Sequence, residues 1–348
     1  MAILLKQSAT LVIDDFQSMR SMLMSFLKTM GVAKIDNAGT AKEALAFLAA
    51  KKYDIVICDY NLGHGQNGQQ ILEEAKHKNY IGYSTIWVMV TAEKTMDMFM
   101  GAAETKPDDY LLKPITESLL ETRLNKLIEK KQSLEPIEKA VKSKEYARAI
   151  AFCDELLKTH SSSTQEIQRI KSDLLLMTGD FPAAKSYFES LLTARSLPWA
   201  KTGLGKAYFL TKEYARAKEI FEDVLAENKM YLDAADWLSK TLDALGDLEQ
   251  AQNVLSRAMA LSPNAAGRQK SLADAAYKNG ALDLAQTSYE KAIKLAEHSV
   301  HKSSSTYSGR AKVLTAKDAP EEALKVLDRT REECKNDPEA ALQAAEIE

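Results

Sequence analysis

Residues 55–61 read Ile-Val-Ile-Cys-Asp-Tyr-Asn, an apolar run that ends on the carboxylate of Asp59. A strand covered on both faces of a parallel sheet has such a continuous hydrophobic sequence. In open α/β sheets, ligands bind beyond the carboxyl ends of the strands. The stretch therefore predicts a buried parallel strand with Asp59 at the edge of a binding site.

The first part of the chain alternates short apolar runs with amphipathic stretches of helical period. This alternation is typical of βαβ units, so we expect a doubly wound α/β domain with a five-stranded parallel sheet. Ser18, Thr40 and Thr116 are suitable N-caps, and Gly31 suits the position just after a helix. The predicted strands cover residues 10–13, 34–37, 55–59, 85–91 and 109–112, and the predicted helices cover residues 18–30, 40–51, 68–76, 95–104 and 116–131.

Polar side chains follow four of the predicted strands. Asp14 and Asp15 come after the first strand, Asp59 ends the third, Thr91 ends the fourth and Lys113 follows the fifth. Because parallel strands end at the same edge of a sheet, we expect these side chains to converge. Clustered carboxylates repel one another unless a hard cation neutralises them, and Mg²⁺ prefers oxygen ligands.

This set of residues suits phosphoryl transfer. A carboxylate such as Asp59 can attack a phosphoryl group and form an acyl phosphate, helped by positioning and by positive charge on the transferred oxygens. Mg²⁺ and Lys113 supply that charge, and the Thr91 hydroxyl can donate a hydrogen bond to the product.

The same residues, with Ala92 after Thr91 and Pro114 after Lys113, resemble the receiver domain of two-component response regulators over about the first 130 residues. The resemblance implies a flavodoxin-like fold and a phosphoryl group accepted from a histidine kinase. The implied roles are Asp59 as phosphoacceptor, Asp14, Asp15, Asp59 and the Asn61 backbone carbonyl as Mg²⁺ ligands, Thr91 as switch hydroxyl, Lys113 as phosphate-sensing ammonium and Tyr110 as switch aromatic.

One feature departs from the family, and simpler interpretations exist. Most receivers have a Met-Pro turn after the phosphoacceptor, whereas residues 62–68 read Leu-Gly-His-Gly-Gln-Asn-Gly, a longer and more permissive loop. A single Asp after a strand is more often a turn or cap residue, and it is the ordered set that favours a receiver. His64 alone is typical of a solvated loop, and Cys58 of an inert core.

Beyond a break at Ser133–Pro136, the sequence predicts helices throughout. An alanine recurs at similar helix positions every 33–38 residues, and its neighbours resemble those of tetratricopeptide repeats. The resemblance implies an all-α superhelical solenoid of about six repeats, with irregular terminal copies. We expect a receiver domain at residues 1–131 and the repeats at 132–348. The alanines are Ala149, Ala184, Ala217, Ala251, Ala285 and Ala323.

A stacked array of helical pairs has a concave surface that can bind another protein, although a spacer or a dimerisation surface remains an alternative. Trp199 and Trp237 are more typical of packing than of peptide binding. Polar residues of the leading helices alternate in charge, which is also typical of a solvated face. The candidate partner-binding residues are Lys206, Asp236, Lys240, Asp243, Lys270 and Asp274.

Composition excludes several other classes. The 348 residues carry a net charge of −3 without a basic field, which argues against nucleic acid as a partner. Three cysteines at unrelated spacings form no disulfide framework, and no secretory or membrane-spanning segment is evident. Motifs of nucleotide-binding or metalloprotease enzymes are absent, so we expect no separate catalytic output domain.

These observations lead to one hypothesis and two alternatives. The hypothesis is a cytoplasmic response regulator whose receiver accepts a phosphoryl group on Asp59 and thereby switches protein binding by the repeats. The first alternative is a phosphate sink or kinase-inhibiting adaptor whose repeats bind the histidine kinase. The second is a scaffold that works without phosphorylation.

Overall fold

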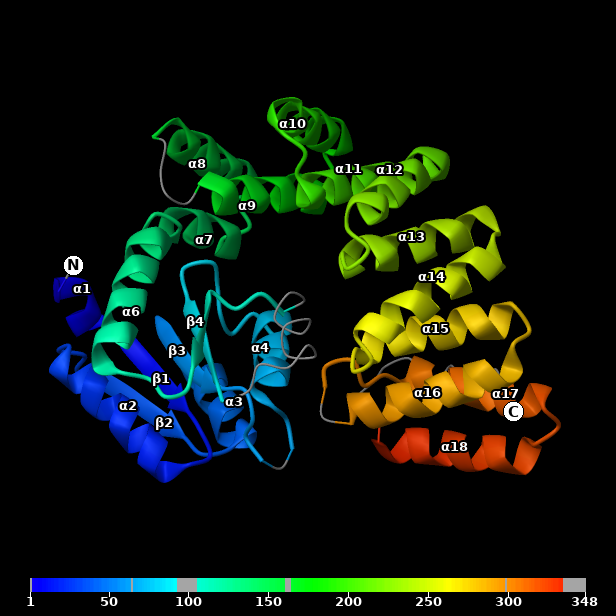
Figure 1. Cartoon of the computed structure of the whole chain (residues 1–348), viewed down its shortest axis with the longest axis horizontal. Coiled ribbons are helices and arrows are strands. Elements are labelled where there is room, and N and C mark those ends of the chain that lie inside the picture. Colours follow the sequence, from blue (N-terminus) through cyan, green and yellow to red (C-terminus); the bar gives the residue numbers. More distant parts are fainter. Residues whose placement is uncertain (1, 64, 93–104, 160–163, 298, 334–348) are drawn as a thin grey trace. The chain divides into compact units, whose positions relative to one another are not determined.

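The computed structural model in Figure 1 describes residues 2–63, 65–92, 105–159, 164–297 and 299–333. The chain forms two compact units, Met1–Asp180 and Phe181–Glu348. The first unit extends past residue 131, the boundary expected between the receiver domain and the repeats. The position of that domain boundary stays a prediction. The helix predicted at residues 95–104 and the side chain of His64 lie outside the described residues.

A parallel sheet of five strands forms the centre of the first unit, in the order β2-β1-β3-β4-β5. The strands are β1 (Ala9–Ile13), β2 (Lys34–Ala38), β3 (Ile55–Asp59), β4 (Ile86–Thr91) and β5 (Asp109–Leu112). Every residue of β3 and β4 is buried, as their apolar sequences predict. The predicted strands are confirmed to within one residue at each end.

Helices cover both faces of this sheet (Figure 1). They are α1 (Ala2–Gln7), α2 (Gln17–Thr29), α3 (Ala41–Ala50), α4 (Gly68–His77) and α6 (Glu117–Gln132). The hydrophobic cluster on one face includes Leu27 of α2 and Leu124 of α6. The cluster on the other face includes Leu48 of α3 and Leu72 of α4. The unit therefore has the predicted doubly wound α/β fold.

Local signals in the sequence account for most helix ends. The side chains of Thr40 and Thr116 accept hydrogen bonds from backbone N–H groups in the first turns of α3 and α6. Gly31 follows α2 with φ of +89°, which a glycine adopts without strain. The prediction of Ser18 as an N-cap is wrong, because α2 begins one residue earlier at Gln17 and its N-cap, Phe16, offers no side-chain oxygen.

Three further helices belong to the first unit: α7 (Glu135–Lys142), α8 (Tyr146–Lys158) and α9 (Thr164–Met177). The predicted break before Pro136 is confirmed, because α6 ends at Gln132 and α7 begins at Glu135. Pro136 lies in the first turn of α7, where its missing N–H costs no helical hydrogen bond. Ile137 and Ile170 form a buried cluster between these helices.

The second unit is a solenoid of packed helices. They are α10 (Phe181–Ala194), α11 (Pro198–Leu210), α12 (Tyr214–Glu227), α13 (Leu232–Leu245), α14 (Leu248–Leu261), α15 (Ala266–Lys278), α16 (Leu282–Ala296), α17 (Ser304–Ala316) and α18 (Pro320–Glu333). Each helix packs mainly on its neighbours in sequence, as repeats do. The six alanines that defined the repeat are all buried, with exposed fractions from 0% to 3%. Ala149 lies in α8 of the first unit, and the other five lie in the second unit.

Small residues lie where these helices cross closely, as the repeat pattern predicts. A Cβ atom on Gly203 would lie 2.3 Å from the ring of Phe188, and one on Gly205 would lie 2.6 Å from the ring of Phe221. Both rings are buried. Only a glycine leaves room for the aromatic ring at these two positions.

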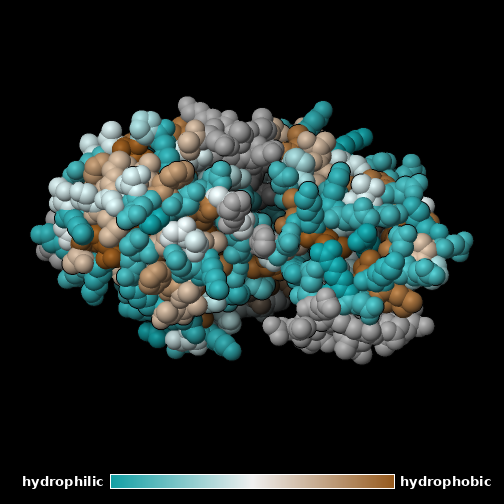
Figure 2. Space-filling model, turned by 90° about the horizontal axis from the view of Figure 1, so that it is seen from below, coloured by the Kyte–Doolittle hydropathy of each residue, from teal (hydrophilic) through white to brown (hydrophobic). Residues whose placement is uncertain are grey.

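Hydrophobic residues on the face of the molecule that Figure 2 shows lie in small patches separated by hydrophilic ones. Among the described residues, no helix is both long enough and apolar enough to cross a membrane.

Candidate functional site

The carboxyl ends of β1, β3, β4 and β5 bring the predicted polar residues to one edge of the sheet. β1 continues into Asp14 and Asp15, β3 ends on Asp59 and β4 ends on Thr91. The backbone N–H of Lys113 donates to the Thr91 carbonyl at 2.8 Å, which continues the pairing of β4 and β5. The sequence-based prediction that these residues converge is correct.

Lys113 lies between two of the carboxylates. Its Nζ atom is 3.0 Å from Asp14 Oδ2 and 2.9 Å from Asp59 Oδ2. The side chain of Asp14 is 1% exposed and that of Asp59 is 7% exposed, so both ion pairs are screened little by water. The Lys113 ammonium therefore neutralises part of the negative charge of these carboxylates.

The pKa values of the pair follow from burial and charge. Burial raises the pKa of Asp59, and the contacts with Lys113 oppose that rise without cancelling it. Burial lowers the pKa of Lys113, but hydrogen bonds with Asp59 and Asp14 outweigh it, so the pKa of Lys113 is raised overall. Asp59 is thus a carboxylate whose charged form is costly and depends on nearby positive charge.

The residues Asp14 and Asp15 are held by α2. Arg20 Nη1 donates to the carbonyl oxygens of Asp14 at 2.6 Å and of Asp15 at 3.1 Å. The Phe16 N–H donates to Asp14 Oδ1 at 2.8 Å. Arg20 was missed by the sequence analysis, although its place in the first two turns of a helix that follows two aspartates offered a signal.

The acidic residues fit a hard cation. One carboxylate oxygen from each of Asp14, Asp15 and Asp59 lies within 4.8 Å of the other two. Two oxygens on one Mg²⁺ are at most about 4.2 Å apart, so small side-chain movements would complete the set. In the described part of the chain, Asp15 Oδ1 is buried and has no hydrogen-bond partner. A buried carboxylate oxygen that accepts no hydrogen bond is expected for a metal ligand, because the bound ion takes the place of the hydrogen-bond donor.

The two predicted switch residues lie beside this edge. Thr91 is 2% exposed at the end of β4. Tyr110 lies inside β5 and packs against the hydrophobic cluster under α3 and α4. Burial raises the pKa of Tyr110 to about 12. Tyr110 is therefore the β5 side chain that links the polar edge to the packing of one face.

The loop after Asp59 approaches the site closely. The backbone of Asn61 interacts with the Asp59 carboxylate and lowers the pKa of Asp59. Gly63 and Gly65 have φ of +71° and +93°, so the permissive glycines of residues 62–68 are used. Gly68 begins α4, and its N–H donates to the Tyr60 carbonyl at 2.8 Å. The sequence analysis treated Gly68 only as part of the permissive loop and as the start of a predicted helix, and the close approach of its backbone to Asp59 was missed.

We expect Gly68→Ala to destabilise the first unit by about 2 kcal/mol, as overpacking does. A Cβ at residue 68 would lie 2.1 Å from the Asp59 carbonyl oxygen, which outweighs the better helix propensity of alanine. Urea unfolding of the full chain would measure the loss. Gly65→Ala is the control, because a Cβ at residue 65 meets nothing within 4 Å and costs only its left-handed backbone, about 1 kcal/mol. An equal loss in both variants would contradict the close approach.

The candidate partner-binding residues of the second unit lie in a network of charges. Lys240 Nζ is 4.5 Å from the centre of the Trp237 ring, and Lys206 also faces that ring. The other contacts are Lys206 with Asp233, Asp236 with Arg268, Asp243 with Lys278, and Lys270 with Asp274. Their role in binding stays a prediction, because these pairs also stabilise the solenoid.

The chain resembles known proteins in two separate regions. Residues 10–125 match the response regulator receiver domain family, and residues 171–231 and 238–300 match a tetratricopeptide repeat family. The chemotaxis protein CheY-3 of Vibrio cholerae serotype O1 is 29% identical over 129 residues, which are 37% of this chain and 98% of that protein. CheY of Pseudomonas aeruginosa is 28% identical over 120 residues, which are 34% and 95% of the two chains.

A solved structure of MamA from Desulfovibrio magneticus RS-1 is 19% identical, with a TM-score of 0.45. The match covers 50% of this chain and 96% of the MamA chain. From the two family matches, the chain carries a response regulator receiver domain followed by tetratricopeptide repeats. The receiver assigns it to response regulator signalling, and the repeats are protein-binding modules. Neither matched family is a catalytic output domain.

Proposed function

We propose that Asp59 accepts a phosphoryl group from a phosphohistidine of a histidine kinase. The observation that supports this most directly is the contact of the Asp59 carboxylate with Lys113 at 2.9 Å, beside two further carboxylates at the end of a parallel sheet. Few structural roles require three acidic side chains and one lysine to meet at a sheet edge. A phosphoryl acceptor requires each of them.

The residues divide the chemistry between them. An Asp59 oxygen attacks phosphorus, a P–O bond forms, the P–N bond to the kinase histidine breaks, and the released imidazole takes up a proton. Mg²⁺, when held by Asp14, Asp15, Asp59 and the Asn61 carbonyl, supplies positive charge to the phosphoryl oxygens. Lys113 is positioned to bind one of these oxygens, and the Thr91 hydroxyl to donate to another.

Phosphorylation then acts as a population shift. Contacts of the phosphoryl group with Lys113 and Thr91 favour one conformation of the receiver, and Tyr110 changes its packing with that conformation. A change from mostly off to mostly on needs about 5 kcal/mol of difference between the two states. The repeats respond by binding a protein partner, and the whole process takes place in the cytoplasm.

Phosphoryl incorporation tests the proposal. Full-length protein incubated with Mg²⁺ and radiolabelled acetyl phosphate should gain a hydroxylamine-sensitive label, and Asp59→Asn should reduce that label to background. Asp54→Asn is the matched control, because Asp54 precedes the same strand at its other end and its carboxylate accepts a hydrogen bond from the Ala9 N–H, far from the carboxyl end of the sheet. Label that persists in Asp59→Asn, or disappears in Asp54→Asn, contradicts the assignment.

The class of partner needs a second measurement. Full-length protein with and without beryllofluoride, a mimic of the phosphoryl group, is used to retain proteins from a lysate. Retention of a protein other than the kinase, dependent on beryllofluoride and lost in Asp59→Asn, supports the switch. Retention of the kinase alone would support the phosphate sink instead of the switch. Retention that is unchanged in Asp59→Asn would support the scaffold.

A further inference from the structure

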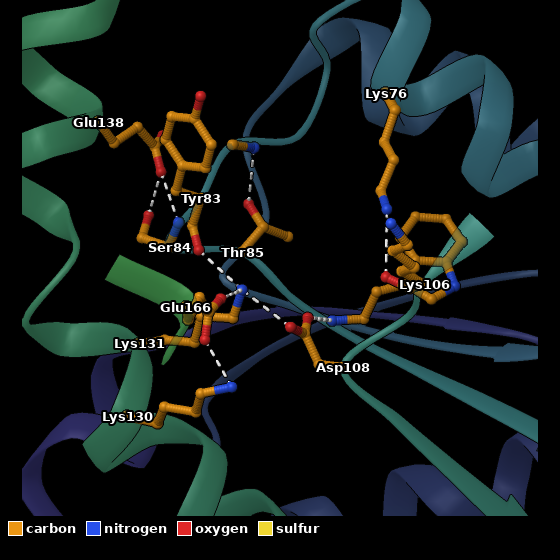
Figure 3. A network of polar contacts seen from close by, with 12 residues as sticks. Lys76, Tyr83, Ser84, Thr85, Lys106, Asp108, Lys130, Lys131, Glu138 and Glu166 are labelled. Carbon is orange, nitrogen blue, oxygen red and sulfur yellow. Dashed lines mark hydrogen bonds and ion pairs between the residues drawn. The ribbon is translucent and has the colours of Figure 1, made fainter. Parts of the chain in front are cut away.

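A second polar cluster lies at the opposite end of the sheet from Asp59, where α6, α7 and α9 meet the receiver. Its centre is Lys131, near the end of α6. Figure 3 shows the Lys131 ammonium among Tyr83, Asp108 and Glu166. Tyr83 lies in the loop before β4, Asp108 directly precedes β5, and Glu166 lies in α9. We refer to these four residues as the Lys131 cluster.

Each hydrogen of the Lys131 ammonium has an acceptor. Nζ is 2.8 Å from the Tyr83 carbonyl, 2.8 Å from Asp108 Oδ1 and 3.0 Å from Glu166 Oε1. The side chain is only 9% exposed. A buried ammonium without partners is costly, so the three contacts must form together. Burial lowers the pKa of Lys131, but the two carboxylates raise it overall, and the group stays charged.

A second set of contacts joins α7 to the same loop. Glu138 Oε2 accepts from the Ser84 N–H at 2.7 Å and from the Ser84 hydroxyl at 2.5 Å (Figure 3). A Cβ at Gly82 would lie 2.3 Å from the Glu138 carboxylate, so a side chain at residue 82 would displace that carboxylate. The Tyr83 side chain packs into the hydrophobic cluster of α7, α8 and α9. The three helices are therefore held to the receiver by both polar and apolar contacts.

Strand β5 connects this cluster to the phosphoacceptor. Asp108 directly precedes β5, Tyr110 lies within it, and Lys113 directly follows it. Asp108 and Lys113 are five residues apart, so at about 3.3 Å per residue the extended backbone between them is roughly 16 Å long. Asp108 Oδ2 also accepts from the Trp87 N–H at 2.8 Å, so β4 is joined at the same point. A displacement of β5 at Lys113 would therefore be expected to change the position of Asp108 relative to α6 and α9.

We propose that the Lys131 cluster couples the state of Asp59 to helices α7, α8 and α9, so that the signal leaves the receiver at the end of the sheet opposite to the phosphorylation site. Lys131 is a positioning residue in this scheme. It joins β5 to α9 through Asp108 and Glu166, and no part of it touches the phosphoryl group. The inference rests on the proposed function, because it requires that occupancy of Asp59 changes the position of Lys113.

Hydrogen exchange of the full-length protein tests the coupling. With Mg²⁺, beryllofluoride should change the exchange of amides in α7 and α9 by about threefold or more in the wild type. Lys131→Met removes the ammonium and keeps the apolar stem, and should abolish this change in α7 and α9 while exchange near Asp59 still responds. A purely structural role of Lys131 would alter the basal exchange rates without altering the response to beryllofluoride.

Lys130→Met is the matched control. Lys130 pairs with the same Glu166 at 2.5 Å, yet its ion pair does not include Asp108. It should keep the wild-type response. If Lys131→Met fails to fold, Glu166→Gln interrupts the same link from α9 and should also abolish the response of α9.

Three negative outcomes are distinguishable. If beryllofluoride changes exchange around Asp59 and leaves α7 and α9 unchanged in the wild type, the coupling is overturned and the proposed function survives. If beryllofluoride changes exchange nowhere, the proposed function fails and the coupling fails with it. A response of α7 and α9 that persists in both Lys131→Met and Glu166→Gln also overturns the coupling.

Discussion

Lys113→Met is expected to destabilise the metal-free first unit by about 3 kcal/mol, the lower end of what breaking a buried ion pair costs. The substitution removes the only ammonium that contacts both Asp14 and Asp59 in the described residues. Asp14 and Asp59 are both buried, so each is left with an uncompensated charge that repels the other. Urea unfolding monitored by hydrogen exchange of β3 and β4 separates this loss from unfolding of the second unit.

The loss should depend on pH with a definite sign. The pKa of Asp59 is raised by burial, so its ionisation costs stability as the pH rises above its ordinary value of 3.8. Without Lys113 that cost grows, because the hydrogen bond and the charge that lowered the pKa are gone. The difference between variant and wild type should therefore be large at neutral pH and shrink as the pH falls toward 4.

Two comparisons make the result specific. Asp59→Asn removes the buried charge itself, so it should stabilise the metal-free protein at neutral pH, and this gain should disappear in acid. Lys51→Met breaks a half-exposed ion pair with Asp36 and should cost at most about 1 kcal/mol. Equal losses in Lys113→Met and Lys51→Met would contradict the electrostatic account.

Mg²⁺ should partly restore the Lys113→Met variant. The ammonium of Lys113 and a cation compete for the same carboxylates, so the variant is expected to bind Mg²⁺ more tightly than the wild type. Ligand binding to the folded state stabilises it in proportion to the logarithm of the ligand concentration. In a titration of unfolding midpoints against Mg²⁺, the rise should begin at a lower Mg²⁺ concentration in the variant than in the wild type. The same onset in both proteins would indicate that the ion does not use Asp14 and Asp59.

The sequence predicted the polar edge of the sheet well because this edge depends on one simple pattern, in which polar residues follow apolar strands. Apolar runs locate the strands, parallel strands end together, and Asp59, Thr91 and Lys113 are then brought near one another by topology alone. The repeats were predicted for a similar reason, since buried small residues such as Ala217 recur with the repeat length. Both features are encoded within short stretches of sequence.

Other features depend on contacts between distant residues and have no local signature. Lys131 lies on a helix among other charges, where a solvated side chain is the usual expectation, and its partner Glu166 is 35 residues away. The extension of the first unit to Asp180 follows from such contacts.

The largest effect in the second unit is expected for Phe221→Ala, at about 3–5 kcal/mol. Phe221 is 0% exposed in α12, and its ring fills the space that Gly205 of α11 leaves open. Truncation creates a cavity between two helices whose backbones already approach closely, so they cannot move together to fill it. Far-ultraviolet circular dichroism during urea unfolding would measure the loss.

The position of Phe221 in the solenoid should make unfolding of the variant less cooperative. Each repeat contacts mainly its neighbours, so a weak interface between α11 and α12 separates the helices before it from those after it. We therefore expect the single unfolding transition of the solenoid to broaden or divide in Phe221→Ala. An unchanged sharp transition at a lower midpoint would indicate that the unit unfolds as one body.

A double-mutant cycle would show that Gly205 and Phe221 act as a pair. Gly205→Ala places a Cβ 2.6 Å from the Phe221 ring and should destabilise the solenoid, whereas Phe221→Leu removes the ring edge that the new methyl meets. The double variant should therefore lose less than the sum of the two single losses, by about 1 kcal/mol or more. Additive losses would mean that the methyl group is accommodated elsewhere, and that a glycine at residue 205 is not required by the aromatic ring.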